Sequence, residues 1–148
     1  MEVKPWQGSD ADANPLGLRH RLYGFDLPAV DIDFLLCEYS SNIPLALIEY
    51  KHRSTGAERC EWNGTHVPRI LFKSAITTLR RLSERMRLPF FVVFYCDEEW
   101  SYEVFHLFDP GDKHCITKTT LTELEFVRFL YKLRGMKMPE ELHGKLNH

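Results

Sequence analysis

Two short apolar runs bordered by charged side chains constrain this sequence more than any other feature. Asp33 opens the first run, and Glu49 and Lys51 close the second. Continuous apolar runs of this length predict strands over Val30–Tyr39 and Pro44–His52, each covered on both faces. Because strand side chains alternate in direction, Glu49 and Lys51 should point to the same face. Charges on buried strands are costly unless they pair with each other or bind a metal.

The segment between the two runs predicts how they pair. Residues 40–43 read Ser-Ser-Asn-Ile, and a turn there would join the strands as an antiparallel hairpin. Residues whose numbers sum to about 83 would then lie opposite each other. Asp33 would lie beside Tyr50, within reach of both Glu49 and Lys51. This pairing would form a pocket for a divalent cation with a lysine at its rim.

Asp33, Glu49 and Lys51 resemble the signature of the PD-(D/E)xK nuclease superfamily. In that signature an acid opens one strand, and an acid-any-Lys triplet ends the next. The stretches Val30–Phe34 and Ile48–Lys51 are similar to the form found in small phage and bacterial members. The resemblance implies a restriction endonuclease-like core and a catalytic set of Asp33, Glu49 and Lys51. It further implies a metal-dependent endodeoxyribonuclease that hydrolyses phosphodiester bonds, in phage or mobile-element DNA processing or recombination.

The chemistry of phosphodiester hydrolysis suits these residue types. Hard oxygen ligands such as carboxylates hold Mg²⁺ or Mn²⁺, so Asp33 and Glu49 are the expected metal ligands, joined by the backbone carbonyl of Tyr50. Lys51 is assigned to positioning water or offsetting phosphate charge, because neighbouring carboxylates favour its charged form. Asp31 has the same strand parity as Asp33. Three roles stay open for it: ligand of a second metal, partner of Lys51, or an acid in solvent at the strand entry.

Five further residues are candidates for contacts with nucleic acid: His20, Arg21, His52, Arg53 and Lys73. His20-Arg21 resembles a His-Arg pair found upstream of the acid in some related phage-type sequences, and a surface pair is an equal alternative. His52 and Arg53 directly follow the proposed catalytic lysine, and Lys73 lies on the expected crossover helix. Each of these three also fits a solvated side chain.

Charge is distributed unevenly along the chain, although the net charge is only −2. Residues 1–50 contain three Lys or Arg and eight Asp or Glu, whereas residues 51–87 contain nine basic and three acidic side chains. Residues 88–148 contain seven basic and ten acidic side chains. The local charges are therefore −5, +6 and −3. A basic block beginning at Lys51 suits phosphate binding, and a helix with a solvated basic face explains it equally well.

The remaining pattern predicts an α/β fold with a mixed central sheet flanked by helices. A long loop is expected over residues 53–65, and the later elements are a helix over Val67–Arg87, strands over Leu88–Cys96 and Ser101–Phe108, and a helix over Leu121–Arg134. Thr120 with Glu123 resembles a capping box for that last helix, and Gly135 should end it. A helical crossover between the second and third strands makes that pair parallel.

The expected organisation is a flexible leader over residues 1–15, one nuclease-like domain over residues 16–135 and a C-terminal tail over residues 136–148. No run is long and apolar enough to span a membrane, and no signal pattern is present, so a cytoplasmic protein is expected. DNA, duplex or branched, is the expected partner. A cut through both strands generally needs two sites, which favours a homodimer, although no sequence feature specifies one. The alternative function is a non-catalytic module on the same fold that binds nucleic acid or protein.

Overall fold

The computed structural model describes residues 34–37, 41–56, 58–62, 64–112 and 116–146. All of them belong to one unit of the chain, residues 33–148. The predicted leader over residues 1–15 and four candidate site residues, His20, Arg21, Asp31 and Asp33, lie outside the described ranges. None of the helices within those ranges combines the length and apolar character needed to cross a bilayer.

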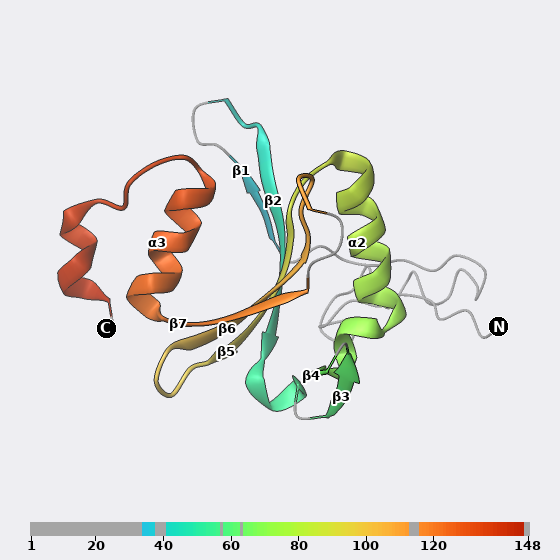
Figure 1. Cartoon of the computed structure of the whole chain (residues 1–148). Helices are drawn as coiled ribbons and strands as arrows, with labels where there is room; N and C mark the ends of the chain where they lie inside the picture. Colours follow the sequence, from blue (N-terminus) through green and yellow to red (C-terminus); the bar gives the residue numbers. More distant parts are fainter. Residues whose placement is uncertain (1–33, 38–40, 57, 63, 113–115, 147–148) are drawn as a thin grey trace, which may run out of the picture. The chain divides into compact units, whose positions relative to one another are not determined.

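A five-stranded mixed sheet forms the centre of the described unit, with the strand order β1-β2-β5-β6-β7 (Figure 1). The strands are β1 (Phe34–Cys37), β2 (Pro44–His52), β5 (Phe90–Cys96), β6 (Ser101–Phe108) and β7 (Thr117–Thr122). β2 and β5 run parallel, and every other neighbouring pair is antiparallel. The expected mixed α/β architecture and the parallel crossover pair are confirmed.

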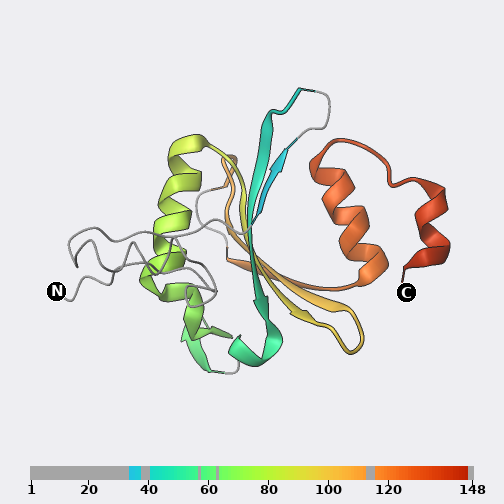
Figure 2. The same cartoon turned by 180° about the vertical axis from the view of Figure 1, so that it is seen from behind.

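Two helices cover opposite faces of this sheet, as the two opposed views show (Figures 1 and 2). α2 (Ser74–Met86) is the crossover between β2 and β5, and it buries Ile76 and Leu79. α3 (Glu123–Leu133) follows β7 and packs Phe126 into a cluster with even-numbered β2 residues such as Ile48. Because strand side chains alternate, the odd-numbered residues of β2 face the α2 side.

The hairpin register differs by one residue from the prediction. Phe34 pairs with Ile48 and Leu35 with Leu47, so the paired numbers sum to 82 at these positions. A one-residue slip moves every side chain to the other face, and this difference therefore decides which side chains meet. Leu35 and Leu47 share the face on which Glu49 lies. The irregularity between Leu36 and Cys37 is where the register shifts toward the turn.

The segment predicted as a loop and the start of a helix instead holds a second, small sheet between two short 3-10 helices. It contains η1 (Arg53–Gly56), β3 (Arg59–Trp62), β4 (Thr65–Pro68) and η2 (Arg69–Phe72). Val67 and Pro68 are buried strand residues opposite Cys60 and Arg59, so the prediction that the helix begins at Val67 was wrong. The helical spacing of apolar residues continues through η2, and the α-helix itself begins only at Ser74.

The end of the chain holds two further corrections. Thr120 is a strand residue paired with Glu103, and the capping box is made by Thr122 and Glu125, two residues later than predicted. The Thr122 Oγ1 accepts from the Glu125 N–H at 3.3 Å, and the Glu125 carboxylate accepts from the Thr122 N–H at 2.8 Å. Gly135, at a φ of 69°, follows the C-cap residue Arg134 at the end of the helix, where it was predicted to stop the helix. The tail contains a short 3-10 helix, η3 (Glu140–Lys145).

Candidate functional site

Glu49 and Lys51 form an ion pair on the α2 side of β2, with the lysine Nζ 2.8 Å from the Glu49 Oε1. The Glu49 side chain is 7% exposed and that of Lys51 is 19% exposed. In the adjacent strand β5, Val92 lies opposite Glu49 and Phe94 opposite Lys51, so the pair is set against apolar side chains. A carboxylate can be buried there because the ammonium group neutralises it. The predicted shared face of these two residues is confirmed.

A second buried carboxylate, Glu103 on β6, lies on the same face of the sheet. The Arg59 guanidinium donates to its Oε1 at 3.1 Å, and the Lys118 Nζ lies 3.2 Å from its Oε2. Phe94 pairs with Lys51 on one side and with Glu103 on the other, so the two buried carboxylates lie on strands that are separated by β5. Sequence reasoning missed Glu103. The available signal was an acid in strand alternation with two buried apolar residues, Phe105 and Leu107.

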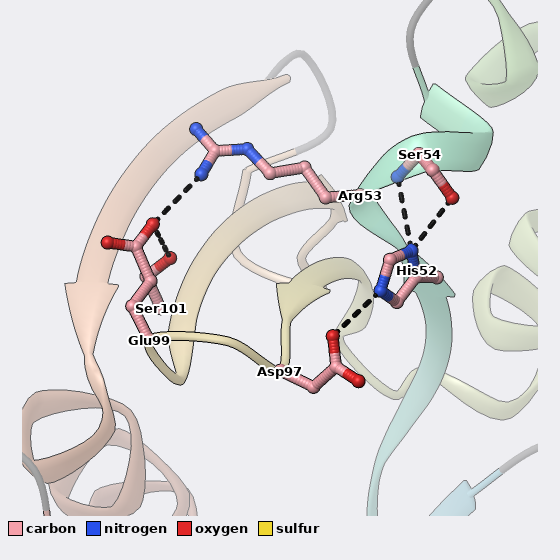
Figure 3. Close-up of polar contacts among 6 residues, drawn as sticks. All are labelled: His52, Arg53, Ser54, Asp97, Glu99 and Ser101. Carbon is pink, nitrogen blue, oxygen red and sulfur yellow. Dashed lines mark hydrogen bonds and ion pairs between the residues drawn. The ribbon is translucent and has the colours of Figure 1, made fainter.

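His52 and Arg53, predicted to contact nucleic acid, join the end of β2 to the turn between β5 and β6 (Figure 3). The His52 Nε2 lies 3.0 Å from the Asp97 Oδ1, and the Arg53 guanidinium lies 3.5 Å from the Glu99 carboxylate. All four side chains are substantially exposed. Neither the His52 nor the Arg53 side chain is buried, so both are sterically open to a phosphate, but each already has an acidic partner.

The hydrogen bonds around His52 fix which ring nitrogen carries the proton in its neutral form. The backbone N–H of Ser54 donates to the Nδ1 at 3.3 Å, and the Ser54 hydroxyl lies 2.8 Å from the same nitrogen. Since a backbone N–H can only donate, Nδ1 is the acceptor and Nε2 carries the hydrogen toward Asp97. The hydrogen bond from His52 is the main cause that lowers the pKa of the Asp97 carboxyl below its ordinary value of 3.8.

The two remaining predicted site residues within the described ranges, Lys73 and Tyr50, lie in different surroundings. Lys73 is exposed at the N-cap of α2, with its backbone carbonyl accepting from the Thr77 N–H at 3.0 Å. The Tyr50 ring turns to the α3 side, 4.9 Å from the Phe34 ring, so only its backbone belongs to the predicted metal pocket. Burial, with a smaller effect of Tyr102, raises the pKa of Tyr50 to about 12.

The described residues alone do not complete a metal centre. Within them, no three His, Cys, Asp or Glu side chains converge closely enough to hold an ion. Glu49 contributes one buried anionic oxygen donor, which is the kind of ligand that Mg²⁺ prefers. The other predicted carboxylates, Asp31 and Asp33, lie outside the described ranges. The predicted metal site therefore stays a prediction.

A groove of about 340 Å³ lies on the other face of the sheet, between α3 and the strands β6 and β7. Its floor includes Phe91, which stacks on His106 at 4.4 Å between ring centroids. Arg128 and Lys132 line it from α3. This groove is separated from Glu49 and Lys51 by the sheet, so it plays no part in the candidate site.

Comparison with known proteins gives no match, whether against protein-family models, curated proteins or solved structures.

Proposed function

We propose that this protein is a metal-dependent nuclease that hydrolyses phosphodiester bonds in DNA. The observation that carries the proposal is the Glu49–Lys51 pair, in which an ammonium group lies 2.8 Å from a buried carboxylate near the end of β2. Asp33 directly precedes β1, the strand paired with β2. The arrangement of an acid before one strand and an acid-any-Lys triplet on the next is the pattern that motivated the nuclease prediction.

The connectivity of the strands supports the same proposal. α2 connects β2 to the parallel strand β5, and β6 then returns antiparallel to β5. A mixed sheet in this order, with helices on both faces, is the architecture expected of a restriction endonuclease-like core. Phage or mobile-element DNA processing is the proposed role, with duplex or branched DNA as substrate.

In the proposed site Asp33 and Glu49 hold Mg²⁺ or Mn²⁺, with the Tyr50 carbonyl and Asp31 as further oxygen donors. Such an ion, when bound, offsets phosphate charge and polarises the phosphorus–oxygen bonds. Lys51 already lies beside the Glu49 carboxylate, so its remaining N–H groups can donate to a phosphate oxygen or orient the attacking water. Its low exposure restricts the positions that the ammonium group can take.

The test is cleavage of supercoiled plasmid DNA by the full chain with Mg²⁺, with Mn²⁺ and with EDTA. Nicking should require the metal, and Glu49→Gln and Lys51→Ala should each lower the rate by at least about 100-fold. Lys132→Ala is the matched control, because it removes an exposed lysine from α3 on the opposite face. Circular dichroism verifies folding. Cleavage by both folded site variants at the wild-type rate would contradict the proposal.

One observation favours the alternative of a non-catalytic binding module. Lys51 lies close enough to Glu49 to neutralise it, so this pair is also compatible with a purely structural role. Calorimetric titration of the full chain with Mn²⁺ separates the two functions. Binding that is lost in Glu49→Gln supports the nuclease, whereas no heat of binding to the wild-type protein supports the module.

A further inference from the structure

Two cations converge on the buried Glu103 carboxylate, on the same face as the Glu49–Lys51 pair. We propose that Arg59 and Lys118, held in place by Glu103, bind a phosphate group of the DNA backbone next to the candidate cleavage site. The inference rests on the nucleic-acid substrate of the proposed function, and it does not require that the DNA be cut.

The charges of this cluster exceed what Glu103 needs. One cation is sufficient to neutralise one carboxylate, yet Arg59 and Lys118 both lie within 3.2 Å of its oxygens. The cluster therefore has a net charge of +1. Arginine and lysine are the side chains that proteins use most to hold phosphate, and a surplus positive charge beside a low-dielectric core attracts an anion more strongly than one in open solvent.

Exposure shows which part of the cluster remains available. The Glu103 side chain is 8% exposed, whereas those of Arg59 and Lys118 are 34% and 41% exposed. The guanidinium has five N–H donors and the ammonium has three, and Glu103 occupies only some of them. The buried carboxylate thus restricts both cationic groups while leaving donors directed to solvent. Restricting long side chains in advance lowers the entropy cost of binding.

The position of the cluster relates it to Lys51. Phe94 lies between Lys51 and Glu103 in the sheet, and neighbouring strands are about 4.8 Å apart. The backbones of Lys51 and Glu103 are therefore separated by two strand spacings. Arg59 reaches Glu103 from β3, so the small β3–β4 sheet is joined to the same face. If a DNA strand placed one phosphate at Lys51, a neighbouring phosphate of the same strand could therefore contact Arg59 and Lys118.

Binding can be measured without cleavage, using the full chain in EDTA and a short fluorescein-labelled DNA duplex over a range of NaCl concentrations. Lys118→Gln should weaken binding roughly tenfold near 0.1 M salt and lower the slope of log K against log salt by about 1. Lys132→Gln makes the same charge change on the other face of the sheet, and it should leave both quantities near the wild-type values. Equal effects of the two substitutions would overturn the inference.

A double variant separates the geometry of the cluster from its charge. Glu103→Gln with Arg59→Gln removes one negative and one positive charge, so the net charge is unchanged and no buried carboxylate is left without its arginine. Affinity should fall, because the guanidinium donors are lost, whereas the salt slope should stay near the wild-type value, because the net charge is unchanged. A folded double variant that binds like the wild type would overturn the inference, and thermal unfolding checks the fold.

The two proposals fail in different ways. If the duplex is bound with the predicted dependence on Lys118 but is not cut with any metal, the nuclease is wrong and the phosphate site stands. If plasmid is cut but Lys118→Gln binds like the wild type, the phosphate site is wrong and the nuclease stands. Absence of duplex binding by the wild-type chain would overturn the phosphate site directly.

Discussion

At the scale of single residues, His52 provides an electrostatic partner whose effect can be measured. Its Nε2 lies 3.0 Å from Asp97, and this contact is the main cause that lowers the Asp97 pKa. NMR titration of the Asp97 carboxyl carbon should give a midpoint below 3.8 in the wild-type protein. In His52→Gln the midpoint should rise toward 3.8. An unchanged midpoint in that variant would contradict the assigned cause.

The sign of this effect on stability follows from linkage. A carboxyl whose folded pKa is lowered contributes stability above its unfolded pKa of 3.8, and the contribution is lost as the pH falls through the lower folded value. The side chain of Asp97 is largely exposed. Solvent screening therefore keeps the energetic consequence small, and the titration midpoint is the better measurement.

The Glu49–Lys51 pair should be coupled in stability as well as in the proposed chemistry. Lys51→Met removes the ammonium group 2.8 Å from a buried carboxylate and should cost about 1–3 kcal/mol of unfolding free energy. Glu49→Gln/Lys51→Met removes both charges, so its loss of unfolding free energy should be smaller than the sum of the two single losses by about 1 kcal/mol or more. Urea unfolding of the four proteins gives the coupling, and additive losses would show that the pair is not coupled.

At the scale of elements, the start of α3 tests which of two nearby threonines caps the helix. The sequence pattern predicts Thr120, whereas Thr122 is the N-cap in the structure. Thr122→Ala should cost about 1 kcal/mol, because its hydroxyl accepts from the Glu125 N–H. Thr120→Ala is the matched control, since Thr120 is an exposed strand residue and should lose much less. Urea unfolding measures both. A larger loss at Thr120 would favour the capping box predicted from sequence.

Elements with strong local signals were predicted well. β6 begins and ends where the alternation of apolar residues indicated, and β5 lies within its predicted run. β7 was missed because four of its six residues are exposed and its threonines show no apolar alternation. The start of α2 was misplaced because Val67 has helical spacing from later apolar residues, whereas pairing with Cys60 is a tertiary contact that periodicity does not contain.

The candidate site likewise contains residues placed by a local pattern and residues placed by tertiary contacts. Glu49 and Lys51 are two residues apart on one strand, so strand parity was sufficient to place them together. Glu103 and Lys118 lie on neighbouring strands of the five-stranded sheet, and Arg59 lies on β3 of the small sheet. Their convergence depends on where the small sheet packs and on the strand order of the central sheet. That order involves a crossover and two reversals, and no local pattern specifies it.

At the scale of the described unit, the two faces of the sheet differ in chemistry. The α3 side is an aromatic cluster in which Tyr102 stacks on Phe126 at 4.1 Å and Phe91 meets Phe129 at 5.0 Å. The α2 side carries both buried carboxylates with their cations. Continuous ring packing on one face supplies hydrophobic stabilisation, which offsets the desolvation of charged groups on the other.

Tyr50 belongs to the aromatic face, and its phenol should make the whole unit sensitive to alkaline pH. Burial raises its folded pKa to about 12, against about 10 in the unfolded chain. Between these values the unfolded state releases a proton that the folded state keeps, so stability should fall as the pH rises. The loss should be about 1–2 kcal/mol, discounted because part of the ring meets water.

Tyr50→Phe tests this linkage, because it removes the titrating hydroxyl while keeping the ring that contacts Phe34 and Phe126. Urea unfolding of both proteins from pH 7 to 12 should show a constant stability difference below pH 9 and a shallower decline for the variant above pH 10. The range below pH 9 is the internal control, since the phenol stays protonated in both states there. Parallel curves across the whole range would show that the Tyr50 hydroxyl is not shielded from water, and the placement of its ring between β1 and α3 would then be wrong.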